Sequence, residues 1–144
     1  MSNLVQVVCP ECDAVNRVPR DRLGAGAKCG KCCTPLFSGT PLALDERRIG
    51  CHIERSGLPL VVDFWAPWCG RCRMMAPAIE AAARMLESQV RLVKVNTEEA
   101  QVTAGRFGIR SIPTLVLFED GREVTRTTGA MDTDRLVAWV RQWL

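Results

Sequence analysis

The sequence predicts an α/β fold, in which a mixed central sheet is flanked by helices and preceded by a small cysteine-rich module. From residue 42 onward, strand-like apolar stretches alternate with stretches of helical period. Before that point the chain has short apolar runs and several glycines, which provide too little hydrophobic content for a core without a cross-link. We therefore place a boundary at Gly39, between a module at 1–39 and a domain at 40–144.

The first half of the domain leads into and out of a buried strand. A short strand is expected near 42–44 and a helix over 45–56. Residues 58–65 are almost continuously apolar, which suits a central strand covered on both faces. A long helix over 69–88 and a strand over 90–95 follow.

The second half of the domain adds an antiparallel hairpin and two helices. Asp120-Gly121 is typical of a hairpin turn. Parallel strands joined by a long helix, with a hairpin at one edge, form a mixed sheet whose active end lies beyond the C-terminal ends of the parallel strands. The remaining elements are a helix at 98–107, strands at 114–118 and 122–128, and a last helix that Asp132 or Thr133 can cap and that has Leu136, Val140 and Trp143 on one face.

Composition argues against several classes of function. The net charge is only +3 and the basic residues are scattered, so nucleic acid is not an expected partner. The first residues lack the basic and apolar regions of a signal peptide, and no apolar run approaches the roughly 20 residues that cross a membrane. We expect a cytoplasmic monomer that does not bind membranes.

The eight cysteines are the most informative residues of the chain. In a cytoplasmic protein, paired cysteines indicate metal binding or redox chemistry more often than structural disulfides. Two of the eight, Cys33 and Cys51, stand outside the Cys-x-x-Cys spacing. The other six form the pairs Cys9/Cys12, Cys29/Cys32 and Cys69/Cys72.

The first two pairs predict a metal site. They are separated by 16 residues, which is within the spacing of a four-thiolate zinc ribbon. Metal binding also explains how so small a module folds, because the binding free energy becomes folding free energy. The alternative is that these residues are redox pairs or unpaired thiols. We expect one Zn²⁺ per chain, in a structural or regulatory role, with the ligands Cys9, Cys12, Cys29 and Cys32.

Three nearby residues allow further assignments. Cys33 could replace Cys32 as the fourth ligand, although the Cys-x-x-Cys spacing favours Cys32. For Cys51 and His52 we expect a small buried thiol and a surface imidazole on a helix.

The third pair predicts a reaction centre, because it lies where a buried strand ends and a helix begins. Cys69 is at the helix N-terminus, where the dipole and the free N–H groups stabilise a thiolate. Cys72 is on the same face one turn deeper, so it can attack a mixed disulfide formed at Cys69. A third metal knuckle is the competing interpretation, but no fourth pair follows to complete it.

Several motifs occur in order along almost the whole chain, and through them it closely resembles the thioredoxins, in particular the bacterial class with an N-terminal zinc ribbon (thioredoxin 2). The motifs are Cys9-Pro-Glu-Cys12 with Asn16-Arg17-Val18-Pro19, Lys28-Cys29-Gly30-Lys31-Cys32, Val62-Asp63-Phe64-Trp65-Ala66-Pro67-Trp68-Cys69-Gly70, Val93-Lys94-Val95-Asn96 and Phe107-Gly108-Ile109-Arg110-Ser111-Ile112-Pro113-Thr114.

The resemblance implies a thioredoxin fold and a reductase of protein disulfides that thioredoxin reductase and NADPH recycle. It implies that Asp63 is the buried carboxylate that exchanges protons with the deeper thiol, tuned by Lys94; a carboxylate simply paired with Lys94 is the plainer alternative. It also implies a cis bond before Pro113. The implied substrate-binding residues are Trp68, Gly70, Arg71, Ile112, Pro113, Gly129 and Ala130.

The chain departs from the family between its two reactive cysteines. Gly70-Arg71 stands where thioredoxins usually have Gly-Pro, and Arg73 adds a second cation. Both cations favour the reduced dithiol, so the sequence suggests a pair more oxidising than an ordinary thioredoxin. A disulfide isomerase or oxidant is therefore the alternative within the same class. A zinc-ribbon adaptor that uses the redox fold as a scaffold is the alternative from another class.

Overall fold

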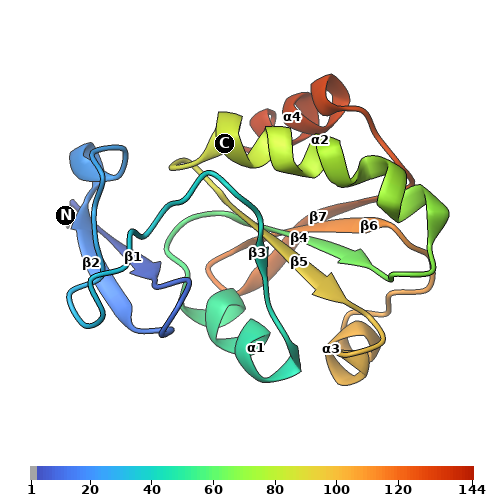
Figure 1. Ribbon diagram of the computed structural model, residues 1–144, viewed down its shortest axis with the longest axis horizontal. Coiled ribbons are helices and arrows are strands. Elements are labelled where there is room, and N and C mark those ends of the chain that lie inside the picture. The colour runs from blue at the N-terminus through green and yellow to red at the C-terminus, as the bar shows by residue number, and fades with distance from the viewer. Residues whose placement is uncertain (1–2) are drawn as a thin grey trace.

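The computed structural model describes residues 3–144, and within them a two-stranded and a five-stranded sheet (Figure 1). No helix in this range is long and apolar enough to cross a membrane. The elements are β1 (Leu4–Val8), β2 (Val15–Pro19), the short 3-10 helix η1 (Arg20–Arg22), β3 (Leu42–Ala43), α1 (Glu46–Arg55), β4 (Leu60–Trp65), α2 (Gly70–Leu86), β5 (Arg91–Asn96), α3 (Gln101–Arg106), β6 (Thr114–Glu119), β7 (Arg122–Thr128) and α4 (Thr133–Arg141).

The larger sheet is mixed, as predicted, and β4 lies at its centre. The strand order is β3-β5-β4-β6-β7, with β4 parallel to β5 and antiparallel to β6. Helices α2 and α4 cover one face, and α1 and α3 the other (Figure 1). Val61 packs toward α2, whereas Val62 and Phe64 pack toward α1, because successive side chains of a strand point to opposite faces. The apolar run of β4 is thus buried on both sides.

Several element boundaries are set by side chains that the sequence makes visible. Asp45 and Asp132 cap α1 and α4, and their carboxylates accept backbone N–H groups at 3.0 and 2.9 Å. Asp120 and Gly121 form the turn between β6 and β7, with φ of 51° and 79°, and this confirms the predicted hairpin.

The start of α3 differs from the prediction by about one turn. The helix begins at Gln101, and its N-cap residue, Ala100, has no capping side chain. Glu46, from the start of α1, accepts the N–H groups of Val102 at 2.7 Å and Thr103 at 3.1 Å instead. This acceptor is 56 residues away from Val102 in the sequence, so no local pattern indicates where α3 starts.

The N-terminal module contains two knuckles with the same backbone pattern. In the first, Asp13 has a φ of 62° and donates its N–H to the carbonyl of Cys9 at 3.1 Å. In the second, Cys33 has a φ of 66° and donates to the carbonyl of Cys29 at 2.9 Å. Asp13 and Cys33 are therefore equivalent turn residues.

The first knuckle binds α1 through a cluster of charged groups. The Asp13 carboxylate accepts hydrogen bonds from Arg48 Nη2 and from His52 Nε2, both at 2.8 Å. Arg48 also donates to the carbonyl of Pro10 at 2.7 Å. His52 is only 1% exposed, so the prediction of a surface imidazole was wrong. The module covers this face of α1, and Asp13 supplies the partner that a buried imidazole requires.

A second contact joins the module to the start of β5. The buried guanidinium of Arg91 donates to the carbonyl of Val8 at 3.2 Å and lies 4.8 Å from the centroid of the Phe37 ring. Arg91 also pairs with Glu87 at 3.6 Å, and Glu87 accepts the N–H of Gly39 at 2.5 Å. The module is therefore attached where the parallel strands β4 and β5 begin.

We expect Asp13→Ala to lower the free energy of unfolding by about 2 kcal/mol, because it leaves Arg48 and the buried His52 without their acceptor. Urea denaturation with saturating zinc measures this loss. Asp21→Ala is the control, since Asp21 is exposed and forms no ion pair among residues 3–144. It is expected to change stability by no more than about 0.5 kcal/mol. Equal effects of the two substitutions would contradict the role of Asp13.

Candidate functional site

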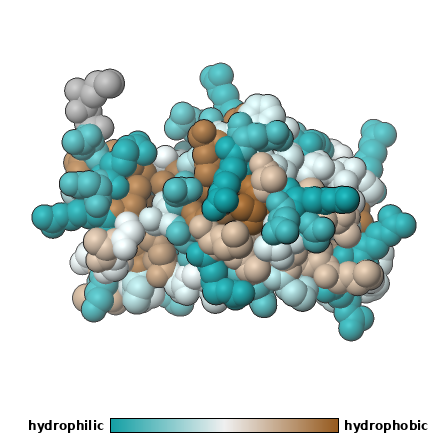
Figure 2. Space-filling view, turned by 90° about the horizontal axis from the view of Figure 1, so that it is seen from above, coloured by the Kyte–Doolittle hydropathy of each residue, from teal (hydrophilic) through white to brown (hydrophobic). Residues whose placement is uncertain are grey.

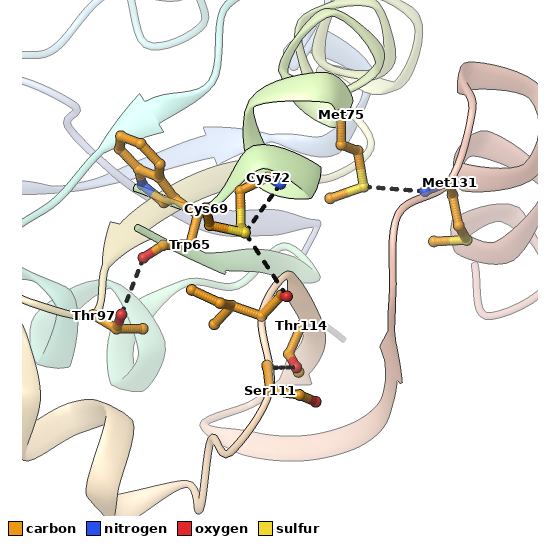
Figure 3. The surroundings of a disulfide bond; sticks show 9 residues. Trp65, Cys69, Cys72, Met75, Thr97, Ser111, Thr114 and Met131 are labelled. Atoms are coloured by element: carbon orange, nitrogen blue, oxygen red, sulfur yellow. Dashed lines mark hydrogen bonds between the residues drawn. A yellow bond between two sulfur atoms is a disulfide. The ribbon is translucent and has the colours of Figure 1, made fainter. Parts of the chain in front are cut away.

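Cys69 and Cys72 form a disulfide at the junction of β4 and α2 (Figure 3). Their Cα atoms are 5.3 Å apart. Cys69 is the N-cap of α2, and its sulfur accepts the backbone N–H of Cys72 at 3.2 Å. Because a helix N-terminus stabilises negative charge, this position favours a thiolate at Cys69 when the pair is reduced.

The loop before β6 lies beside the disulfide. Its Ile112–Pro113 peptide bond is cis, as the resemblance implied. The carbonyl oxygen of Ile112 lies 3.9 Å from Cys69 Sγ, and the Ile112 side chain packs against the two cysteines. Pro113 is buried, and its carbonyl accepts the N–H of Gly129 at 2.9 Å. Segments that are far apart in the sequence therefore meet next to Cys69.

Exposed apolar side chains border the disulfide. Trp68, directly before Cys69, is 68% exposed, and Met74, in the first turns of α2, is 78% exposed. Ala130, next to Gly129, is exposed as well. Figure 2 looks onto the side of the molecule that α2 and α4 cover, where hydrophobic surface alternates with extended hydrophilic side chains. This border is suited to binding an apolar segment of another chain.

Two contacts near the disulfide were not predicted. The Sδ atom of Met75 accepts the N–H of Met131 at 3.4 Å, and the hydroxyl of Thr114 donates to the carbonyl of Ser111 at 2.6 Å (Figure 3). The first holds the segment before α4 against α2, and the second holds the loop that contains Pro113. Both methionines look like ordinary core residues in the sequence, so no signal could have identified their contact.

Asp63 is a buried carboxyl group on the face of β4 that α2 covers. Strand alternation puts it on the same face as Val61, which packs against α2. It is 3% exposed, and its Oδ1 has no hydrogen-bond partner among residues 3–144. Burial raises the pKa of Asp63 from 3.8 to about 7, and the charge of Lys94 offsets part of this rise. A carboxyl group with such a pKa can exchange protons near neutral pH.

Lys94 is the cross-strand neighbour of Asp63 in the β4–β5 register, yet these two side chains form no ion pair within the described part of the chain. The Lys94 ammonium lies 4.5 Å from the centroid of the Trp65 ring instead. Trp65 is half-buried and packs against the two cysteines. Lys94 therefore acts on Asp63 through its charge and not by direct pairing.

The second group of sulfurs lies in the N-terminal module. Its four Sγ atoms are within 4.8 Å of one another, with Cys9 and Cys32 separated by 3.5 Å and Cys12 and Cys29 by 3.7 Å. Four thiolates in a tetrahedron, each about 2.3 Å from a zinc ion, would be about 3.8 Å apart. The donor set therefore fits one tetrahedral zinc ion. Cys33 lies outside this set.

Hydrogen-bond donors surround these sulfurs. Cys9 Sγ accepts the N–H of Glu11 at 3.4 Å, and Cys29 Sγ accepts the N–H of Lys31 at 3.4 Å. The side-chain amide of Asn16 also donates to Cys29 Sγ, at 3.5 Å. Such donors offset the negative charge of thiolates and orient them.

Comparison with protein families matches both parts of the chain. Residues 44–142 match the family described as "Thioredoxin", and residues 8–34 match the zinc-ribbon family described as "Thioredoxin 2, N-terminal".

Individual proteins agree with these matches. Thioredoxin C-3 of Corynebacterium nephridii is 40% identical over 138 residues, which cover 96% of this chain and 94% of that protein. Thioredoxin 1 of Synechococcus elongatus is 53% identical over 80 residues, or 56% of this chain and 75% of that protein. The fold resembles that of a mutant thioredoxin from Halobacterium salinarum, with a TM-score of 0.66, 30% identity and coverage of 74% of this chain and 93% of that one.

Asp63→Asn removes the cost of burying an ionised carboxylate. Because the folded pKa of about 7 exceeds the ordinary 3.8, the folded state binds more protons between these values, so the stability of the wild type falls as pH rises through this window. We expect the variant to exceed the wild type in free energy of unfolding by about 2–4 kcal/mol at pH 8 and by little at pH 4.

Urea denaturation of the oxidised proteins at both pH values measures this difference. The exposed residue Asp21 provides the matched control, and Asp21→Asn is expected to give no gain that grows with pH. A gain for Asp63→Asn that is equal at pH 4 and pH 8 would show that burial of charge is not its cause.

Proposed function

Because the chain belongs to the thioredoxin family, we propose that Cys69 and Cys72 divide the two steps of a protein-disulfide reduction between them. The chain is a thiol–disulfide oxidoreductase of the protein-disulfide reductase type. In the proposed roles, Cys69 is the nucleophile and Cys72 is the resolving thiol. The observation that carries this assignment is the position of Cys69 at the N-cap of α2, where its sulfur accepts the N–H of Cys72.

In the first step, the Cys69 thiolate attacks one sulfur of the substrate disulfide. A mixed disulfide forms, and the other substrate sulfur leaves as a thiolate that takes up a proton. In the second step, deprotonated Cys72 attacks the Cys69 sulfur and releases the remaining substrate thiolate. Two electrons then have passed to the substrate, and the chain holds the Cys69–Cys72 disulfide.

Asp63 is proposed as the group that accepts the proton of Cys72 and returns it when the pair is reduced again. Its pKa of about 7 and its position on the face of β4 beneath α2 support this role. Lys94 is proposed to tune that pKa through its positive charge, which favours the carboxylate.

The proposed substrate surface surrounds Cys69. Ile112 and the cis bond before Pro113 offer a backbone edge on which a substrate segment can add like a strand. The other proposed contacts are Trp68, Gly70, Arg71, Gly129 and Ala130.

Insulin reduction coupled to thioredoxin reductase and NADPH tests the two roles. We expect Cys69→Ser to lose turnover at least about 100-fold, because the attacking thiolate is gone. Cys72→Ser is expected to lose turnover and to accumulate a mixed disulfide through Cys69. Cys51→Ser, outside both sulfur groups, is the control and is expected to retain turnover. Turnover by Cys69→Ser, or none by the wild type, would contradict the assignment.

The N-terminal module is proposed to hold one zinc ion through Cys9, Cys12, Cys29 and Cys32. The tetrahedral spacing of the sulfurs and the zinc-ribbon family match support this proposal. When bound, zinc cross-links the two knuckles and supplies folding free energy to a module with a small core.

Substitution of the adjacent residues Cys32 and Cys33 tests which of them is the fourth zinc ligand. We expect Cys32→Ser to bind less than one zinc ion per chain in the presence of a competing chelator, because three thiolates remain. Cys33→Ser is expected to retain one zinc ion, because Cys33 is a turn residue outside the cluster. Zinc is measured by elemental analysis after gel filtration. Loss of zinc only in Cys33→Ser would assign the fourth ligand to Cys33.

The proposed partners are proteins that contain disulfides, and thioredoxin reductase as the recycling enzyme. The family and the named relatives support this coarse assignment. A monomeric, cytoplasmic protein is proposed, in which the cysteines of the module stay reduced and available for metal.

Arg71 gives one reason to consider an oxidant or isomerase. Its exposed guanidinium lies between the two cysteines in sequence and favours the reduced, thiolate form of the pair. We expect a reduction potential above the about −270 mV of an ordinary thioredoxin, and a lower potential in Arg71→Pro. Redox titration against glutathione measures both. An equal or lower potential in the wild type would contradict this expectation.

A further inference from the structure

We propose that the active-site surface selects disulfides flanked by acidic side chains, through the guanidinium groups of Arg71, Arg73 and Arg110. The inference rests on the proposed reductase function and names the class of its substrates.

The three arginines come from two segments that meet at Cys69. Arg71 and Arg73 are exposed in the first turn of α2. Arg110 is exposed in the loop before β6, two residues before Ile112, whose carbonyl oxygen is 3.9 Å from Cys69 Sγ. Three cations thus border the sulfur that attacks the substrate.

These cations have no partner inside the described part of the chain. Other arginines in residues 3–144 do have partners: Arg48 pairs with Asp13, and Arg126 pairs with Glu123. For Arg71, Arg73 and Arg110, by contrast, residues 3–144 provide neither an ion pair nor a side-chain hydrogen bond. Their charges are therefore available to a bound chain.

Carboxylates are absent from the segments that form the surface. Residues 66–79, 107–118 and 124–131 contain no Asp or Glu. The next acidic residue, Asp132, is already engaged as the N-cap of α4. Glu98 and Glu99 are exposed in the loop after β5, and Glu99 lines a pocket together with Trp65 and Lys94. All charged residues of these three segments are therefore arginines, so the segments that meet at Cys69 carry only positive charge.

Exposed apolar side chains near Cys69 indicate a second property of the substrate. Trp68 directly before Cys69 and Met74 in α2 are exposed apolar side chains of the segment that also contains Arg71 and Arg73. A complementary partner has an apolar residue near its disulfide and Asp or Glu residues on either side. Arginine is suited to this selection, because its planar guanidinium pairs with a carboxylate through two hydrogen bonds.

Synthetic peptides with one identical disulfide loop, flanked by Glu, Gln or Lys, test the inference directly. The protein is reduced beforehand and mixed with each peptide, so that single-turnover rates do not depend on a reductase. We expect the order Glu, Gln, Lys, with about tenfold between the extremes at low ionic strength and less than about twofold at 0.5 M salt, because exposed ion pairs are weak and screened.

Two triple variants with equal net charge identify the residues responsible. Arg71→Gln, Arg73→Gln and Arg110→Gln together are expected to remove the preference for the acidic peptide. The control combines Arg22→Gln, Arg55→Gln and Arg141→Gln, at exposed positions outside the three segments, and is expected to keep that preference.

Equal rates of the wild type on all three peptides would overturn the inference but not the proposed function. A preference for the acidic peptide that survives in the variant of Arg71, Arg73 and Arg110 would do the same. Failure of the wild type to reduce any peptide would overturn the proposed function, and the inference with it.

Discussion

Burial of β4 on both faces is the constraint on which the rest of the structure depends. The strand is paired on both edges, with β5 and β6, and its residues pack toward the helices on either side. Such a strand cannot shift its register without moving apolar side chains into the wrong layer. Its end therefore fixes where α2 starts, and so where Cys69 lies. The same strand holds Asp63 below the helix, where burial raises its pKa.

Much of the fold could be predicted because its signals are local. The apolar run at 58–65, the Asp120-Gly121 turn and the capping residue Asp132 each specify their own element. The errors arose where a distant residue decides the outcome. The start of α3 depends on Glu46, and the burial of His52 depends on Asp13 of the N-terminal module. Neither partner can be identified from the residues next to it in sequence.

Some features of the candidate site could likewise be predicted from local sequence, and others could not. The spacing of Cys69 and Cys72, at the junction of a strand and a helix, indicates redox chemistry from the sequence alone. The cis bond before Pro113 came from resemblance, because an X-Pro bond is usually trans. The sequence alone could not predict that the segment of Arg110 lies near that of Arg71. The two segments meet only because Ile112 packs against the cluster that contains the cysteines.

The attachment of the N-terminal module at the start of β4 and β5 has a consequence for sulfur chemistry. The reactive disulfide follows the other end of β4, a strand of six residues that spans about 20 Å. Thiol exchange requires direct contact between sulfurs, so Cys69 cannot reach the four clustered thiolates of its own chain. Any thiol exchange between the two groups of cysteines must therefore take place between two molecules, and its rate must scale with protein concentration. The length of β4 thus keeps the reactive cysteine pair of each chain away from the metal ligands of the same chain.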